Sequence, residues 1–205
     1  MIYSYSSLKM YQTCPAQWDA VYRRKAVRRE ESPALAKGIR IHAQLEEAVL
    51  KGTPAPVWTP PGLMATLQDN TVVVEAEYAI TFDMTPCGFW DEAAWLRGKV
   101  DVAMVRGPKA IVLDWKTGQV RVDPLQADVY ATLMRAAHGS TLAITFSFIF
   151  VEQAQTATLK PDSGAEERVR AIIDTIEADE VFEPTPCWAC YDCPVVSCEH
   201  QGKRR

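Results

Sequence analysis

The chain has 205 residues and a mass of 22.9 kDa, with 48% apolar and 23% charged residues. These proportions are those of a globular protein, and they exclude a disordered chain and a small domain that depends on disulfides. The formal net charge of −4 excludes a uniformly basic nucleic-acid coat. No apolar run reaches the ~18 residues of a membrane span, and no secretory signal opens the chain, so we expect a cytoplasmic protein.

The N-terminal part is predicted to be helical. Apolar spacing predicts a helix over 4–28, broken or restarted at Pro15, with Ser6 or Ser7 as its N-cap. A second helix is predicted over 34–50, and a loop rich in Gly and Pro follows it.

Strands and helices then alternate. We expect strands over 72–82, 94–105 and 110–114, of which the last two are joined by a turn at Gly107-Pro108. The remaining elements expected are a helix over 124–138 closed by Gly139, a strand over 142–151, and a helix over 163–178 with Ser163 as N-cap. This order predicts an α/β or α+β fold with a central mixed sheet flanked by helices.

One domain is expected from the length, at roughly 150 residues per domain. It would comprise N-terminal helices over 1–52, a core over 70–152, and a C-terminal helix with a cysteine-rich tail over 163–205.

Basic residues concentrate in one segment. Five cations fall within seven residues: Arg23, Arg24, Lys25, Arg28 and Arg29. We predict that this basic run contacts nucleic-acid phosphates without reading sequence. A solvated helix end is the alternative, and it is favoured for the second group of cations, Lys203, Arg204 and Arg205.

Two carboxylates and an ammonium are predicted to converge. Asp101 and Asp114 lie near the ends of neighbouring strands, and Lys116 shares the face of Asp114 because strand side chains alternate. This combination is typical of a site for a hard divalent cation with a positioned water. The alternative is a surface hairpin with scattered charges, but the apolar strand 110–113 places Asp114 close to the interior.

With these motifs the sequence resembles the PD-(D/E)XK nuclease superfamily, and within it the RecB-like exonuclease branch that includes CRISPR-associated and phage enzymes. The resemblance runs from about residue 4 to 198 and rests on five motifs in order. They are Ser4, Ser6 and Leu8 with Tyr11-Gln-Thr-Cys-Pro15; Gly38, His42 and Glu46; Gly98-Lys-Val-Asp101; Asp114-Trp-Lys-Thr-Gly118; and Gln126 with Tyr130.

The resemblance implies a restriction-endonuclease-like core and a metal-dependent DNA nuclease, acting as an exonuclease on single strands or free ends. Its partners would be DNA and proteins of recombination, repair or CRISPR pathways. The ligands of Mg²⁺ or Mn²⁺ would be His42, Asp101, Asp114 and the backbone carbonyl of Trp115. Lys116 would orient the attacking water and stabilise developing charge.

The resemblance also assigns roles on the helix over 124–138. Gln126 and Tyr130, four residues apart on one face, would position the DNA strand and brace the site. Glu46 is a candidate for indirect support of the metal site, whereas Glu77 is not expected to be a ligand.

Six cysteines are unevenly placed. Four of them lie within twelve residues of the tail: Cys187, Cys190, Cys193 and Cys198. Clustered thiols of this spacing indicate metal, either zinc or iron–sulfur.

The resemblance implies a [4Fe-4S] cluster on Cys14, Cys190, Cys193 and Cys198 that staples the first helix to the tail. Four residues separate the last two cysteines where the family has five, so Cys187 is an alternative ligand. A local zinc site in the tail is the alternative cofactor, and Cys87 is expected to be a free thiol.

Two other functions compete with a nuclease. A non-catalytic nucleic-acid-binding module would be expected to have lost one of Asp101, Asp114 and Lys116. A redox protein would need a flavin or nucleotide site, of which the sequence gives no sign.

Overall fold

The computed structural model describes residues 1–27, 32–68 and 72–203. Arg28, Arg29, Arg204 and Arg205 of the two predicted basic segments lie outside this range. The helical elements are α1 (Tyr5–Thr13), α2 (Pro15–Trp18), the π-helical turn η1 (Asp19–Arg23), α3 (Pro33–Lys51), α4 (Leu63–Gln68), α5 (Pro124–His138), α6 (Ala165–Ala178) and the 3₁₀ turn η2 (Trp188–Cys190). The strands are β1 (Val73–Ile80), β2 (Leu96–Arg106), β3 (Lys109–Lys116), β4 (Ala143–Phe150) and β5 (Gln155–Leu159).

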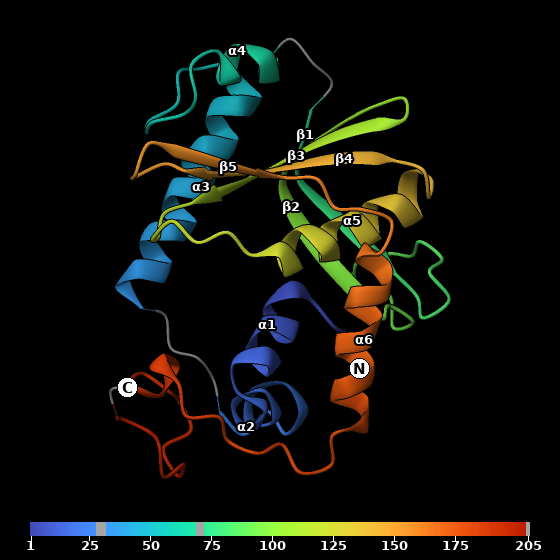
Figure 1. Ribbon diagram of the computed structural model, residues 1–205. Helices are drawn as coiled ribbons and strands as arrows, with labels where there is room; N and C mark the ends of the chain where they lie inside the picture. The colour runs from blue at the N-terminus through green and yellow to red at the C-terminus, as the bar shows by residue number, and fades with distance from the viewer. Residues whose placement is uncertain (28–31, 69–71, 204–205) are drawn as a thin grey trace.

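The strands form one sheet in the order β1-β2-β3-β4-β5. Only β3 and β4 are parallel, and α5 is the crossover between them; the other neighbours pair antiparallel. The predicted mixed sheet flanked by helices is therefore confirmed, as an α+β arrangement (Figure 1).

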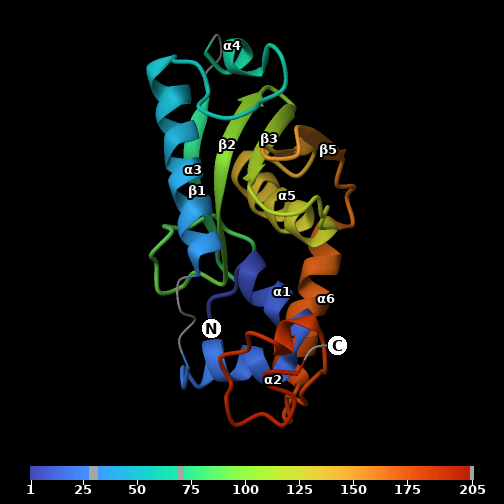
Figure 2. The ribbon, with the colours of Figure 1, turned by 90° about the vertical axis from the view of Figure 1, so that its left-hand side faces the viewer.

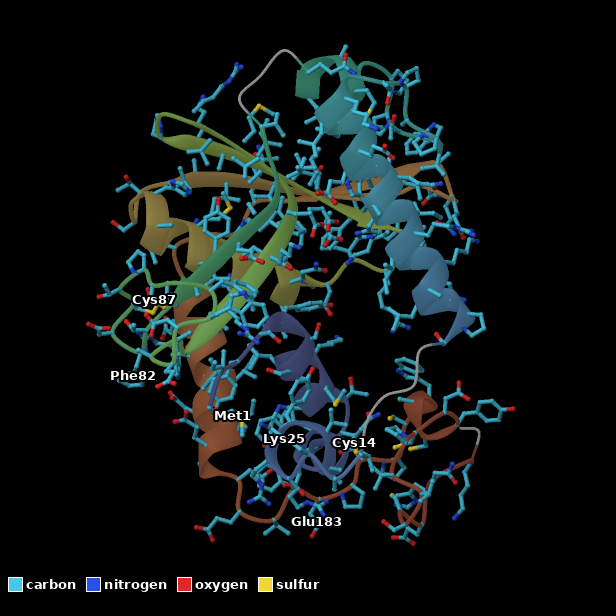
Figure 3. The ribbon with its side chains drawn as sticks, turned by 180° about the vertical axis from the view of Figure 1, so that it is seen from behind. Met1, Cys14, Lys25, Phe82, Cys87 and Glu183 are labelled. Atoms are coloured by element: carbon cyan, nitrogen blue, oxygen red, sulfur yellow. The ribbon has the colours of Figure 1, made fainter. Side chains whose placement is uncertain are left out.

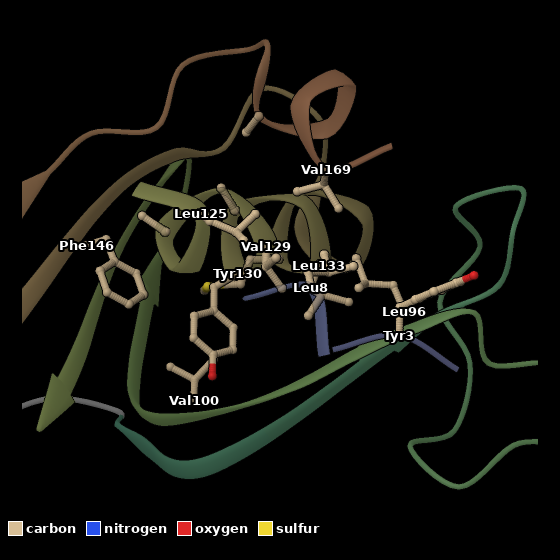
Figure 4. Close-up of a cluster of buried hydrophobic side chains, with 14 of the residues drawn as sticks. Tyr3, Leu8, Leu96, Val100, Leu125, Val129, Tyr130, Leu133, Phe146 and Val169 are labelled. Carbon is tan, nitrogen blue, oxygen red and sulfur yellow. The ribbon is translucent and has the colours of Figure 1, made fainter. Parts of the chain in front are cut away.

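Each face of the sheet carries its own apolar layer. On one face α5 packs on the sheet and is backed by α1 and α6, and the core there includes Leu8, Val100, Tyr130, Phe146 and Val169 (Figure 4). On the other face α3 and α4 cover a smaller cluster (Figure 2). The sequence motifs of β2 and β3 that carry Asp101, Asp114 and Lys116 thus lie between two helical layers.

The N-terminal helices lie beside the C-terminal tail, although the two segments are at opposite ends of the chain (Figure 3). The Trp18 ring stacks on Phe182 at 5.5 Å between centroids, and the Tyr11 hydroxyl donates to the Asp179 carboxylate at 2.8 Å. The helix predicted over 4–28 is two pieces, because Cys14 is extended (φ −161°) in front of Pro15.

Two predicted N-caps are wrong. The cap of α1 is Ser4, whose hydroxyl accepts from the Ser7 N–H, and Ser7 completes a capping box. Helix α6 begins at Ala165 with Gly164, not Ser163, at its N-cap position, and it has no side-chain cap.

Two short elements, α4 and the edge strand β5, were not predicted. Of the helices described, none is long and apolar enough to cross a membrane.

Candidate active site

The site forms where β2 and β3 separate. Their antiparallel pairing runs from Arg106 and Lys109 at the hairpin to Val102 and Leu113, and the pairing ends one step before Asp101 and Asp114. On the other side of β2 the pairing with β1 also skips Asp101, opposite Glu75, which has a positive φ of 51°. The interruptions separate β2 from its neighbours at Asp101, while Asp114 stays in register with Phe148 of β4.

Asp114, Lys116 and Gln126 form one polar group, of which the shared strand face predicted only Asp114 and Lys116. Lys116 Nζ lies 2.6 Å from Asp114 Oδ2 and donates to Gln126 Oε1 at 3.0 Å. Gln126 Nε2 in turn donates to Asp114 Oδ1. Gln126 therefore holds the lysine and the carboxylate in a fixed relation.

Asp101 is held from two sides. Its Oδ2 accepts the Trp115 backbone N–H at 2.7 Å, and its Oδ1 lies 3.2 Å from His42 Nδ1. His42 comes from α3, so three elements meet at this carboxylate. An interaction with the Trp115 backbone also acts to raise the pKa of His42.

Burial of Asp114 changes its acidity. The side chain is enclosed, and loss of solvation raises its pKa to about 6, against the opposing effect of Lys116. Burial alone would lower the pKa of His42, but the hydrogen bond and negative charge of Asp101, with the charge of Asp114, raise it above its usual value. The negative charge of the two carboxylates is therefore not fully balanced by Lys116.

The donors fit a divalent cation. Asp114 Oδ2 is buried, and its ion-pair partner Lys116 Nζ lies 2.6 Å away. A buried carboxylate of this kind, beside a second carboxylate and an imidazole, suits an oxygen-preferring metal ion. Across the described parts of the chain, no three His, Cys, Asp or Glu side chains already stand at metal-site spacing.

Tyr130 lies one turn beyond Gln126 but is directed elsewhere. Its hydroxyl donates to the Lys99 carbonyl at 2.8 Å, and its ring stacks on Phe146. These contacts hold β2 against α5. Among the other candidates, Glu46 lies close enough to raise the pKa of Lys99, whose main partner is Glu75.

Three residues near the site were not predicted. Tyr5 of α1 donates to Asp123, the N-cap of α5, and the charge of Asp114 contributes to the raised pKa of its hydroxyl. Arg121, in the segment between Lys116 and Gln126, lies 5.6 Å from the ring centroid of the exposed Trp188. The sequence offered one indication of two of them: Tyr5 lies between Ser4 and Ser6, and Trp188 lies between Cys187 and Cys190.

Five of the cysteines lie around one hollow. A hollow of about 20 Å³ is lined by Cys14, Cys187, Cys190, Cys193 and Cys198, together with His200. All six cysteines of the chain are free thiols, and Cys87 lies in a separate loop, away from Cys14 (Figure 3).

Contacts around the hollow join the chain ends. The backbone N–H of Thr185 donates to Cys14 Sγ at 3.4 Å, while its carbonyl lies 4.0 Å from Cys190 Sγ. Burial raises the pKa of the Cys187 and Cys193 thiols.

The basic run is partly neutralised. Asp19 forms ion pairs with both Arg23 and Arg24, and the Arg23 guanidinium also lies over the Phe182 ring, 4.4 Å from its centroid. Lys25 is exposed and has a positive φ of 51°.

Comparisons with known proteins agree with the fold. The family model described as PD-(D/E)XK nuclease superfamily matches residues 2–77 and 62–198. The solved structure "Crystal structure of SSO0001" is similar with a TM-score of 0.59 and 19% sequence identity, over 98% of this chain and 86% of that one. A search of curated proteins gives no significant match.

Proposed function

Because this chain belongs to the PD-(D/E)XK nuclease superfamily, we propose that it is a metal-dependent DNA nuclease of the RecB-like branch, which hydrolyses single strands or free ends as an exonuclease. Proteins of this superfamily are generally nucleases and typically use Mg²⁺ or Mn²⁺. The observation that carries the proposal is the convergence of Asp101, Asp114, Lys116 and Gln126, with His42 beside them.

The metal would be held by Asp101, Asp114, His42 and the carbonyl of Trp115. When bound, it supplies a Lewis acid at the phosphodiester and an acidified water. Asp101 is already oriented for this role by the Trp115 N–H. Neutralisation of Asp114 by a cation would also offset the cost of burying its charge.

Lys116 positions the nucleophile. An ammonium has three donors. One contacts Gln126 and another faces Asp114, so a third remains for a water or a phosphate oxygen. Tyr130 acts on the backbone of β2 through Lys99, which keeps Asp101 in place.

Single-strand preference is supported by Trp188 and Arg121. The Trp188 ring is 66% exposed and contacts the segment that joins Lys116 to Gln126. An exposed aromatic ring beside a guanidinium can stack an unpaired base, which is worth about 1–3 kcal/mol per base. A base inside a duplex offers no free face, so this contact favours an unpaired strand.

We further propose a [4Fe-4S] cluster on Cys14, Cys190, Cys193 and Cys198, with Cys187 as an alternative ligand. The support is the shared hollow that these thiols line, with residues from both chain ends. Zinc in the same hollow is the alternative. We also propose that residues 1–205 form one nuclease domain and that proteins of recombination, repair or CRISPR pathways are its partners. Both proposals rest on the resemblance.

Digestion of 5′-labelled linear single-stranded DNA and of circular single-stranded DNA tests the function, with Mg²⁺ or Mn²⁺ present and with EDTA in their place. We expect metal-dependent loss of the linear strand only. Cleavage of the circle would contradict exonuclease action, and binding without cleavage of either would support the non-catalytic module. A matched duplex with blunt ends tests the single-strand preference.

A further inference from the structure

A second cationic site lies at the opposite end of β3 from Asp114. A groove of about 810 Å³ opens there between the β2–β3 hairpin, the start of β4 and the connection from β5 to α6. Four cations line it, Arg106, Lys109, Arg135 and Lys160, and no carboxylate of the described residues does. In a chain with a net charge of −4, this is a local reversal of sign.

Two of these cations face each other across a tight turn. Arg106 and Lys109 are directly paired in the antiparallel register of the Gly107-Pro108 hairpin. Like charges in this position destabilise a hairpin. Both side chains are exposed, and among the described residues neither has an ion-pair partner. The fold therefore keeps an electrostatic cost that an anion would remove.

The other cations and nearby hydroxyls complete the groove. Arg135 is fixed by backbone carbonyls of Leu142, Pro161 and Asp162, so its charge cannot swing away. The adjacent carboxylate of Asp162 is engaged by Arg168 and the Gly164 N–H. Hydroxyl donors suited to phosphate oxygens are contributed by Ser140, Thr141 and Ser163.

The spacing to the active site favours a polymer as the ligand. Lys109 and Asp114 are five positions apart along β3, which corresponds to about 17 Å. At about 3.4 Å per nucleotide along a stacked strand, this distance equals about five nucleotide steps, so a strand of about six or more nucleotides is long enough to reach both ends of β3. A mononucleotide cannot do so. The hairpin itself is held in place, because the Ala143 N–H donates to the Pro108 carbonyl at 2.9 Å.

We propose that this groove, the far-end groove, binds the phosphodiester backbone of the nucleic-acid substrate at a distance from the cleaved bond. The proposal rests on the proposed nuclease function for the identity of the polymer. The groove retains a portion of the strand while its end is in the active site, so long strands bind more tightly than short ones.

Binding of fluorescent 3-mer and 30-mer oligothymidylates in EDTA, at several salt concentrations, tests the proposal without requiring cleavage. The variants are Lys109→Gln and Arg106→Gln/Lys109→Gln. The control is Lys51→Gln, which removes another exposed cation, one that is paired with Glu47 on α3.

For the 30-mer, the slope of log K against log salt should become shallower by about 0.7 for the single variant and about 1.4 for the double variant. Binding of the 3-mer, which is too short to reach both sites, should not change in the same titration. Thermal stability of the variants should be equal to or above that of the wild type, because a like-charge contact is removed.

Equal slopes in wild type and variants, an equal effect of Lys51→Gln, or a parallel loss of thermal stability would each overturn the proposal. Tighter binding of poly-L-glutamate than of the 30-mer at this groove would instead show an acidic protein partner and would also overturn it. If the chain cleaves nothing but the slopes change as expected, the nuclease function fails and the groove stands.

Discussion

Gly98 is the position where one methyl group should disturb the site most. An ideal Cβ on Gly98 would lie 2.7 Å from Tyr130 Cε1 and 3.0 Å from Leu133 Cδ1. Tyr130 cannot easily withdraw, because its ring stacks on Phe146 at 5.7 Å and its hydroxyl is bound to Lys99 (Figure 4). The φ of Gly98 is not positive, so the conflict is steric and not conformational.

Gly98→Ala should therefore overpack the contact between β2 and α5. Overpacking of a core costs about 1–3 kcal/mol. For a protein of this size, that corresponds to a melting temperature lower by about 2–12 °C. Denaturant and thermal unfolding measure the change directly. Gly118→Ala is the control, because no atom lies within 4 Å of its added Cβ, and it should change stability by less than about 0.5 kcal/mol.

A double variant separates the steric cause from others. Tyr130→Leu removes the ring that the new methyl group meets, so its combination with Gly98→Ala should show a coupling energy of at least about 0.5 kcal/mol. If Gly98→Ala leaves the unfolding free energy unchanged, or if the two changes are additive, then Tyr130 does not close on β2 as described.

Three further predictions concern the site, the acid limb of stability and the tail. Gln126→Ala should release Lys116 and Asp114 and lower kcat about 10- to 100-fold with an unchanged fold, which steady-state kinetics and circular dichroism measure; normal kcat would contradict it. Backbone N–H donation from Phe182 lowers the pKa of Asp179, so its stabilisation is present above about pH 4 and is lost as pH falls through the depressed folded-state value. The melting temperature of Asp179→Asn should therefore be lower than that of the wild type at pH 7, and the two should be equal at a pH under about 3. An equal difference in melting temperature at both pH values would refute this. Cys14→Ser should lower iron content and thermal stability together, whereas colourless protein with stoichiometric zinc and a stable variant would favour the zinc site.

The prediction of the fold from sequence succeeded where periodicity was strong. The β2–β3 hairpin, the crossover helix α5 and the mixed sheet all follow from apolar runs separated by turn residues. The edge strand β5 was missed, because its five residues alternate without large apolar side chains. The cap at Ser163 was wrong because α6 begins at Ala165, which puts Gly164 at the N-cap position.

The candidate site was predictable in part for a similar reason. Period two placed Asp114 and Lys116 together, but the sequence does not show that Gln126 joins them. The neutralisation of Arg23 and Arg24 by Asp19 depends on a π-helical turn that no spacing rule indicates. Likewise, the contact of Arg121 with Trp188 joins residues 67 positions apart and is set by tertiary packing.

The most direct test of the central claim compares two buried aspartates. Asp114 carries the proposed metal and lysine contacts, whereas Asp128 of α5 is equally buried but is bound by Arg168 away from the site. With Mn²⁺ and end-labelled single-stranded DNA, we expect Asp114→Asn to lose hydrolysis to background while it stays folded, and Asp128→Asn to lose stability but keep its activity when folded. Full activity of Asp114→Asn, or equal loss in both variants, would contradict the assignment of the active site to Asp101, Asp114 and Lys116.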